Sequence, residues 1–144
     1  MTFKQFDAKT FYLNFWTGFN AFSEKSKLGL KLKKAPSRYY YEFFYRLRGS
    51  SRFSIYIYPK ENEANCSLFI PKQKEIFYEL LESKQQIENK LGRLDWQELP
   101  TKQASRIRQS KNIDLFAYDS RQMAFQWLGG RLVEFQAVLI PYLQ

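Results

Sequence analysis

Apolar and polar residues alternate with two different periods along this chain, and each change of period marks an element. Between Pro71 and Trp96, apolar residues recur every three or four positions, and Lys, Glu and Gln occupy most of the positions between them. This spacing places the apolar side chains on one face of a helix. Pro71 suits the first helical turn, and Gly92 suits the left-handed residue after the last. The pattern predicts one amphipathic helix, after which Leu94 and Trp96 fold back toward the core.

A second segment with the helical period lies near the start of the chain. Its apolar residues run from Phe11 to Phe22, and Asp7 is available as an N-cap. We therefore expect a helix over about residues 7–23. Gly18 lies in its interior and weakens it by up to ~1 kcal/mol unless another element packs closely there.

A third helix is predicted close to the end of the chain. Asp119 or Ser120 can cap it, and the apolar period continues until Pro141 ends it. Gly129 and Gly130 interrupt this helix at a cost of about 1 to 2 kcal/mol in helix propensity. We expect either a close approach by another element at this pair or a bend in the helix.

The segments between these helices show the two-residue period of strands. Tyr39–Arg48 and Arg52–Tyr58 are rich in aromatic residues and are separated by Gly49, which predicts an antiparallel hairpin. The tyrosine face of its second strand is a platform for nucleobases, a face that a helix covers, or simply a half-buried face. In that strand one face consists of Phe53, Ile55 and Ile57, and the other of Ser54, Tyr56 and Tyr58.

Three further segments complete the expected sheet. Cys66–Ile70 reads as a short third strand, and Ala104–Gln109 reads as another, although a helical turn also fits the latter. Glu24–Arg38 fits an edge strand or an extended loop, whose lysines discourage pairing with other chains. We therefore predict one α+β domain over residues 1–144, with a mostly antiparallel sheet of three to five strands and about three helices on one face.

The charge balance narrows the choice of partner. The chain has 23 Lys and Arg against 14 Asp and Glu, a net charge of +9 and a pI near 9.6. Such a protein attracts anions, so DNA or RNA is the first candidate partner. The chain shows no signal peptide and no apolar run of membrane-spanning length, which predicts a cytoplasmic protein without a membrane partner.

The residues that usually carry out catalysis are largely missing from the sequence. It contains no histidine, only one cysteine (Cys66) and no glycine-rich phosphate loop. Two Glu-x-Lys triplets, Glu82–Lys84 and Glu88–Lys90, resemble part of a nuclease motif. Both lie in the predicted central helix, where residues two apart point in different directions. We therefore predict no catalytic residues, no metal and no cofactor.

The basic residues that remain are interleaved with aromatic residues. Phosphate contact needs no particular order among them, only a shared face. We predict that this face binds nucleic acid. Its members are Lys31, Lys33, Lys34, Arg38, Arg46, Arg48, Arg52, Arg106 and Arg108.

The region from Arg52 to Leu143 resembles the bacterial domain family of unknown function DUF4268. The resemblance implies an α+β domain that is often fused to a restriction-endonuclease-like domain, and it names no catalytic residue. Among the matched positions, Glu88, Trp96 and Arg106 are either binding residues or a core tryptophan beside a structural Glu88–Arg106 ion pair. The likeness rests on Tyr56, Ile57, Phe77, Leu80, Lys84, Ile87, Glu88, Leu91, Gly92, Trp96, Arg106, Ile107, Trp127, Pro141 and Tyr142.

These features favour a non-enzymatic nucleic-acid-binding module of a bacterial defence or restriction-type system. The principal alternative is a protein-interaction module that docks an effector or forms a homodimer through exposed aromatic residues. A degenerate or metal-dependent nuclease is the third reading, and it requires several carboxylates and a lysine to converge in the fold.

Overall fold

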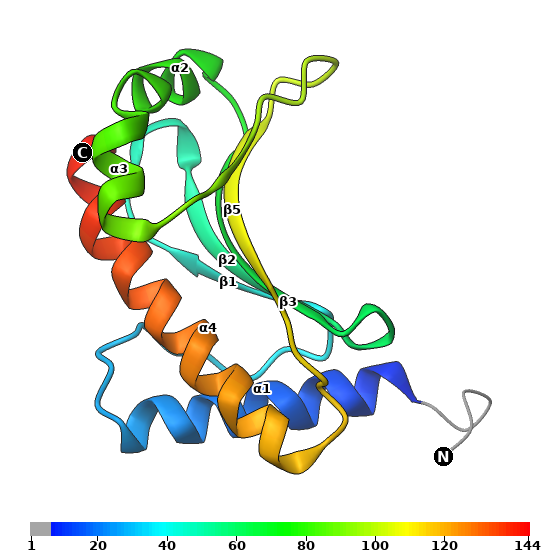
Figure 1. Ribbon diagram of the computed structural model, residues 1–144. Coiled ribbons are helices and arrows are strands. Elements are labelled where there is room, and N and C mark those ends of the chain that lie inside the picture. The colour runs from blue at the N-terminus through cyan, green and yellow to red at the C-terminus, as the bar shows by residue number, and fades with distance from the viewer. Residues whose placement is uncertain (1–6) are drawn as a thin grey trace.

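The computed structural model describes residues 7–144, in which helices cover one face of an antiparallel sheet (Figure 1). The predicted α+β class is confirmed, with four α-helices and five strands in these residues. The helices are α1 (Ala8–Lys25), α2 (Lys74–Glu82), α3 (Lys84–Leu91) and α4 (Tyr118–Leu139). The strands are β1 (Tyr40–Phe44), β2 (Arg52–Tyr58), β3 (Glu63–Ile70), β4 (Asp95–Gln97) and β5 (Ser105–Asn112). Short 3-10 turns occupy η2 (Arg48–Ser50), η3 (Pro59–Glu61) and η4 (Ile140–Tyr142).

The sheet has the order β1-β2-β3-β5-β4, and every neighbouring pair is antiparallel. The predicted hairpin is confirmed as β1 and β2, with Tyr41 opposite Ile55. The long strands bow so that their helix-free face is concave, on the right of Figure 1. Most of that face is open because α2, α3 and α4 lie on the other side, and the N-terminal end of α1 reaches only its lower end, where Ala8 and Tyr12 line a pocket with Tyr39 and Tyr58.

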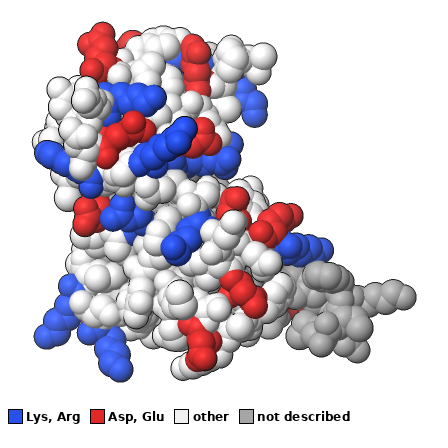
Figure 2. Space-filling model, in the orientation of Figure 1, with Lys and Arg blue, Asp and Glu red and all other residues white. Residues whose placement is uncertain are grey.

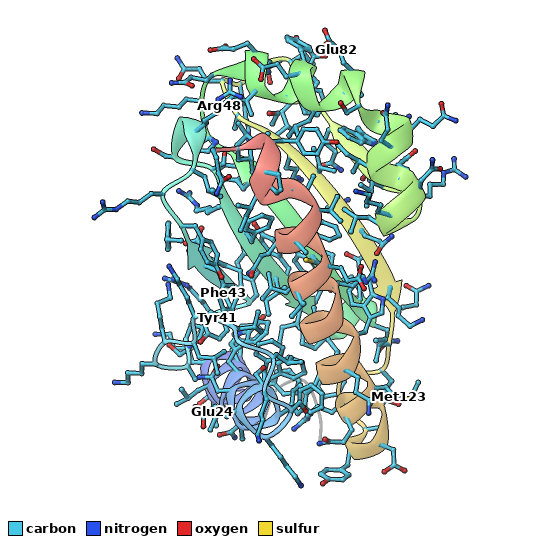
Figure 3. All side chains as sticks on the ribbon, turned by 90° about the vertical axis from the view of Figure 1, so that its left-hand side faces the viewer. Glu24, Tyr41, Phe43, Arg48, Glu82 and Met123 are labelled. Carbon is cyan, nitrogen blue, oxygen red and sulfur yellow. The ribbon has the colours of Figure 1, made fainter. Side chains whose placement is uncertain are left out.

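The core fills the space between the sheet and the helices. Alternate strand residues point into it, as a sheet with one covered face requires. Figure 3 looks onto this layer and shows α4 lying across the strands. The strand residues buried here are Tyr41, Phe43, Phe53, Ile55, Ile57, Ala64, Cys66, Leu68, Ile70 and Ile107.

Two of the helix glycines permit close packing between elements. A Cβ at Gly129 would lie 2.7 Å from Leu28 Cδ1, and one at Gly18 would lie 2.8 Å from Phe125 Cζ. The close approach predicted as one alternative for the Gly129–Gly130 pair is therefore confirmed at Gly129, and the Phe125 side chain packs as closely against Gly18. Gly130 has no atom of this kind within 4 Å, so its lack of a side chain serves no packing.

The central helix was predicted as one element, and this was wrong. It breaks at Ser83 into α2 and α3, and Pro71 lies before α2 instead of in its first turn. The break lets each half follow a different partner, because α2 packs against β3 and β5 while α3 packs against α4. The end of the region is confirmed: Gly92 has a φ of 83°, and Leu94 is buried.

Several boundaries also differ from the prediction. The last helix begins at Tyr118, and its N-cap is Ala117, which has no capping side chain, so neither Asp119 nor Ser120 caps it. Strand β3 begins at Glu63 because Glu63, Ala64 and Asn65 continue the pairing with β2. Of the two predicted alternatives for Glu24–Arg38 the loop is found from Ser26 onward, since Glu24 and Lys25 still belong to α1. Strand β4 was not predicted.

Within residues 7–144 no helix is long and apolar enough to cross a membrane.

Candidate functional site

The helix-free face of the sheet combines aromatic, small polar and charged side chains. It is made by the strand residues that alternate with the core positions. Cross-strand register aligns them in rows, such as Tyr40, Tyr56 and Asn65 across β1, β2 and β3. The face consists of Tyr40, Glu42, Phe44, Arg52, Ser54, Tyr56, Tyr58, Glu63, Asn65, Ser67, Phe69, Asp95, Gln97, Arg106, Arg108, Ser110 and Asn112.

Four tyrosines gather at one side of this face. Tyr39 lies centrally in this tyrosine cluster, with its ring centroid 5.0 Å from Tyr40, 6.1 Å from Tyr56 and 5.7 Å from Tyr58. Tyr56 and Tyr58 are stacked, with 8° between their ring planes. Desolvation raises the pKa of the Tyr56 and Tyr58 hydroxyls, so these two side chains remain neutral near pH 7. Of the arrangements that the sequence left open for this tyrosine row, Tyr56 and Tyr58 are half-buried, and only the N-terminal end of α1 approaches them.

Two arginines lie close to aromatic rings on the same face. The guanidinium carbon of Arg38 is 4.4 Å from the Tyr40 ring centroid. That of Arg52 lies 5.4 Å from Phe44 and 5.0 Å from Phe69. Such cation–π contacts hold the planar groups in place while their edges can still donate hydrogen bonds.

Small polar residues form the floor between the tyrosines and the arginines of β5. Ser54, Asn65 and Ser67 are at most 1% exposed although no helix covers them. The Ser67 hydroxyl donates to Asn65 Oδ1 at 3.3 Å. Because these three side chains are shorter than the neighbouring tyrosines and arginines, the surface of the concave face is depressed here. Ser54 was predicted on this face, but Asn65 was missed because the predicted third strand began only at Cys66; the alternation of Asn65 with Ala64 and Cys66 could have shown it.

Carboxylates accompany several of the predicted phosphate-binding arginines. Arg52 Nε lies 2.7 Å from Glu42 Oε2, and Arg108 Nε lies 3.2 Å from Asp95 Oδ2. Arg106 donates a hydrogen bond to the neutral Gln97 side chain. The positive charge of Arg52 and of Arg108 is therefore partly offset by a neighbouring carboxylate. Figure 2 shows the same interspersion of basic and acidic side chains over the upper part of the molecule.

The remaining predicted cations do not share one face. Arg48 lies beside α2 (Figure 3), where it makes two hydrogen bonds of 2.7 and 3.1 Å to the Glu79 carboxylate. That contact lowers the pKa of Glu79. Lys33 lies over Phe44 at the β1 edge, whereas Lys31 lies over Tyr45, which packs against the core residue Phe53. Lys34 and Arg46 are exposed outside the strands.

A pocket of about 260 Å³ lies in the free face beside the tyrosine cluster. A second pocket of about 480 Å³ shares Tyr39 and extends past Tyr12 and Tyr58. The two therefore form neighbouring hollows along the same aromatic surface. The first is lined by Tyr39, Tyr40, Glu42, Arg52, Tyr56 and Phe69.

The family-matched residues Glu88 and Trp96 contact each other on the other side of β4. Glu88 Oε2 accepts hydrogen bonds from the Leu94 backbone N–H at 2.9 Å and from Trp96 Nε1 at 3.1 Å. These bonds, the backbone one first, lower the pKa of Glu88. The suggested Glu88–Arg106 ion pair is wrong, because Glu88 holds the turn at Gly92 while Arg106 lies on the free face.

The described residues hold no group of three or more His, Cys, Asp or Glu side chains arranged to bind a metal. Burial raises the pKa of the Cys66 thiol, so this side chain is an inert part of the core near neutral pH. The Glu82–Lys84 triplet spans the break between α2 and α3 instead of lying within one helix.

A comparison with known protein families identifies the family of this chain. The family model described as a domain of unknown function (DUF4268) matches residues 11–143. The chain belongs to the DUF4268 family. No curated protein and no solved structure matches it. The geometry of this DUF4268 domain is therefore the basis for proposing its function.

Proposed function

We propose that this DUF4268 domain binds single-stranded RNA or DNA on the helix-free face of its sheet, as a non-enzymatic module of a bacterial restriction-type system. One observation carries the proposal: a concave sheet face on which a tyrosine cluster adjoins arginines. Bases stack on aromatic rings, and phosphates attract guanidinium groups. The net charge of +9 supports attraction to a polyanion.

Single strands suit this face better than duplexes. Stacking on tyrosine needs a base whose flat surface is exposed, and duplex pairing hides that surface. The neighbouring hollows on either side of Tyr39 offer places for consecutive bases. Arg106 and Arg108 lie on the same face as the tyrosines, in register with Phe69 and Ser67, and supply positive charge beside the proposed path of the strand.

The proposal is tested by titrating labelled single-stranded RNA, single-stranded DNA and duplex DNA at several salt concentrations. We expect the single strands to bind more tightly than the duplex, and affinity to fall with salt. Arg106→Ala should reduce the slope of log K against log salt by about 0.7, the value for one phosphate contact on a single strand.

Lys90→Ala is the matched control, since it removes one exposed positive charge from α3 in the helix layer. Its salt slope should equal that of the unmodified protein. Absence of binding at low salt overturns the proposal. Equal losses from both variants indicate attraction to the net charge alone and also overturn it.

A further inference from the structure

We propose that the pocket beside the tyrosine cluster selects guanine over the other bases, an inference that rests on the proposed single-strand function. The pocket joins flat aromatic walls to one carboxylate and one guanidinium. A nucleobase is a flat ligand whose edge carries hydrogen-bond donors and acceptors. The aromatic walls of the pocket can contact the flat surface of a base, and the Glu42–Arg52 pair can bond to its edge.

Aromatic side chains bound the pocket on opposite sides of that pair. The rings of Tyr40 and Tyr56 lie 6.1 Å apart between centroids and are inclined by 32°. Phe69 lies on the Arg52 side, with its ring 5.0 Å from the guanidinium carbon. The concave floor lets a base enter from solvent, since no helix covers this face.

The polar pair is fixed before any ligand arrives. Arg52 Nε and Glu42 Oε2 are 2.7 Å apart, and the side chains are only 26% and 17% exposed. Phe44 and Phe69 hold the plane of the guanidinium. A carboxylate has about four acceptor positions and a guanidinium has five N–H donors, so their mutual contact uses a small part of either.

Guanine matches the order of these groups. Its Watson–Crick edge carries the O6 acceptor, then the N1–H donor, then the N2 amino donor. A carboxylate that only accepts can take both adjacent N–H groups, while the neighbouring Arg52 donates to O6. Adenine, cytosine and uracil each present one such donor position to the carboxylate. They leave an acceptor facing Glu42 or lose the second bond.

A well-matched bidentate contact discriminates against the wrong base by about 1 to 3 kcal/mol, a factor of roughly 5 to 150. Because this pocket is open on one side, water reduces the penalty for a mismatched base. We expect a preference of about tenfold for guanine at one position.

The test measures fluorescence anisotropy with labelled oligouridylates that carry one central G, A or C, and with the all-uridine strand. The protein should bind the G-containing strand about tenfold more tightly than the other three. Glu42→Gln should abolish that preference, because its amide replaces one acceptor by a donor.

Asp95→Asn is the matched control. It removes the acid from the other ion pair of the same face, Arg108–Asp95, and it changes the net charge by the same amount. This variant should keep the guanine preference. A purely structural role for Glu42 predicts that both variants keep it.

The outcomes separate the two proposals. Absence of binding to every strand overturns the proposed function and this inference together. Binding without guanine preference in the unmodified protein overturns only the guanine inference, and that measurement needs no variant to fold. Retention of the preference by Glu42→Gln also overturns it.

Discussion

The two faces of strand β2 differ in what covers them. Toward the helices it presents Phe53, Ile55 and Ile57, all with 0% exposure. Toward solvent it presents Arg52, Ser54, Tyr56 and Tyr58, in a setting that no helix covers. Packing accounts for the first set, because each side chain is enclosed by the core. Arg52, Tyr56 and Tyr58 of the second set are only half-buried, and the proposed binding assigns these side chains a role.

The difference between the covered and the free face predicts its largest effect on stability at two adjacent residues of β3. Leu68 points into the core and is fully buried, whereas Phe69 points to the free face. Leu68→Ala should lower the free energy of unfolding by about 2 to 5 kcal/mol through cavity formation. Phe69→Ala should cost about 1 kcal/mol or less, since water already reaches that face. Urea unfolding measures both; equal losses would contradict the division between the faces.

The second prediction concerns binding, for which the free face should matter more than the helix layer. Tyr56→Ala should weaken the binding of single-stranded RNA by about 1 to 3 kcal/mol, the value of one base–aromatic stack. Tyr118→Ala makes the same change at a 73% exposed position on α4. It should leave the affinity unchanged. Similar losses from the two variants would show that exposed tyrosines bind without regard to face.

The third prediction concerns pH and the Glu88 turn. The pKa of Glu88 is lowered in the folded state, so its contribution to stability is complete above the ordinary value and is lost as pH falls through the folded value. Glu88→Gln should cost about 1 kcal/mol at pH 7. The difference between the two proteins should shrink below about pH 4. Thermal unfolding across pH measures it, and a difference independent of pH would contradict the role of the charge.

The smallest effect is expected at the two glycines of α4. Gly130→Ala should raise stability by about 0.5 to 1 kcal/mol, because it improves helix propensity and meets no neighbour. Gly129→Ala has the same propensity gain, but its Cβ would lie 2.7 Å from Leu28 Cδ1. We expect no net gain there. Calorimetric melting temperatures distinguish the two.

Periodicity was sufficient to predict the covered face. The alternation of Phe53, Ile55 and Ile57 identified a strand with one buried side, and the helical periods located the N-terminal and C-terminal helices. The break at Ser83 could not be predicted, because Leu80 and Ile87 keep the same helical face whether or not the helix continues. Tertiary packing against different partners decides that break.

The candidate site was predictable only in part. Arg52, Arg106 and Arg108 share the free face, but nothing local in the sequence pairs Arg52 with Glu42 or Arg108 with Asp95. Those contacts depend on strand register across the sheet. The same register brings Tyr39 and Tyr40 to Tyr56, and it separates Arg48 from them. The binding of nucleic acid by these residues stays a prediction.

The central claim is that the helix-free face binds the strand, and NMR chemical-shift mapping tests it most directly. Amide and arginine Nε signals are followed while unlabelled single-stranded RNA is added to labelled protein. The account predicts that shifts concentrate at Arg38, Arg52, Tyr56 and Arg106, with little change along α2 and α3. Shifts concentrated on α2 and α3, with the signals of the free face unchanged, would contradict it.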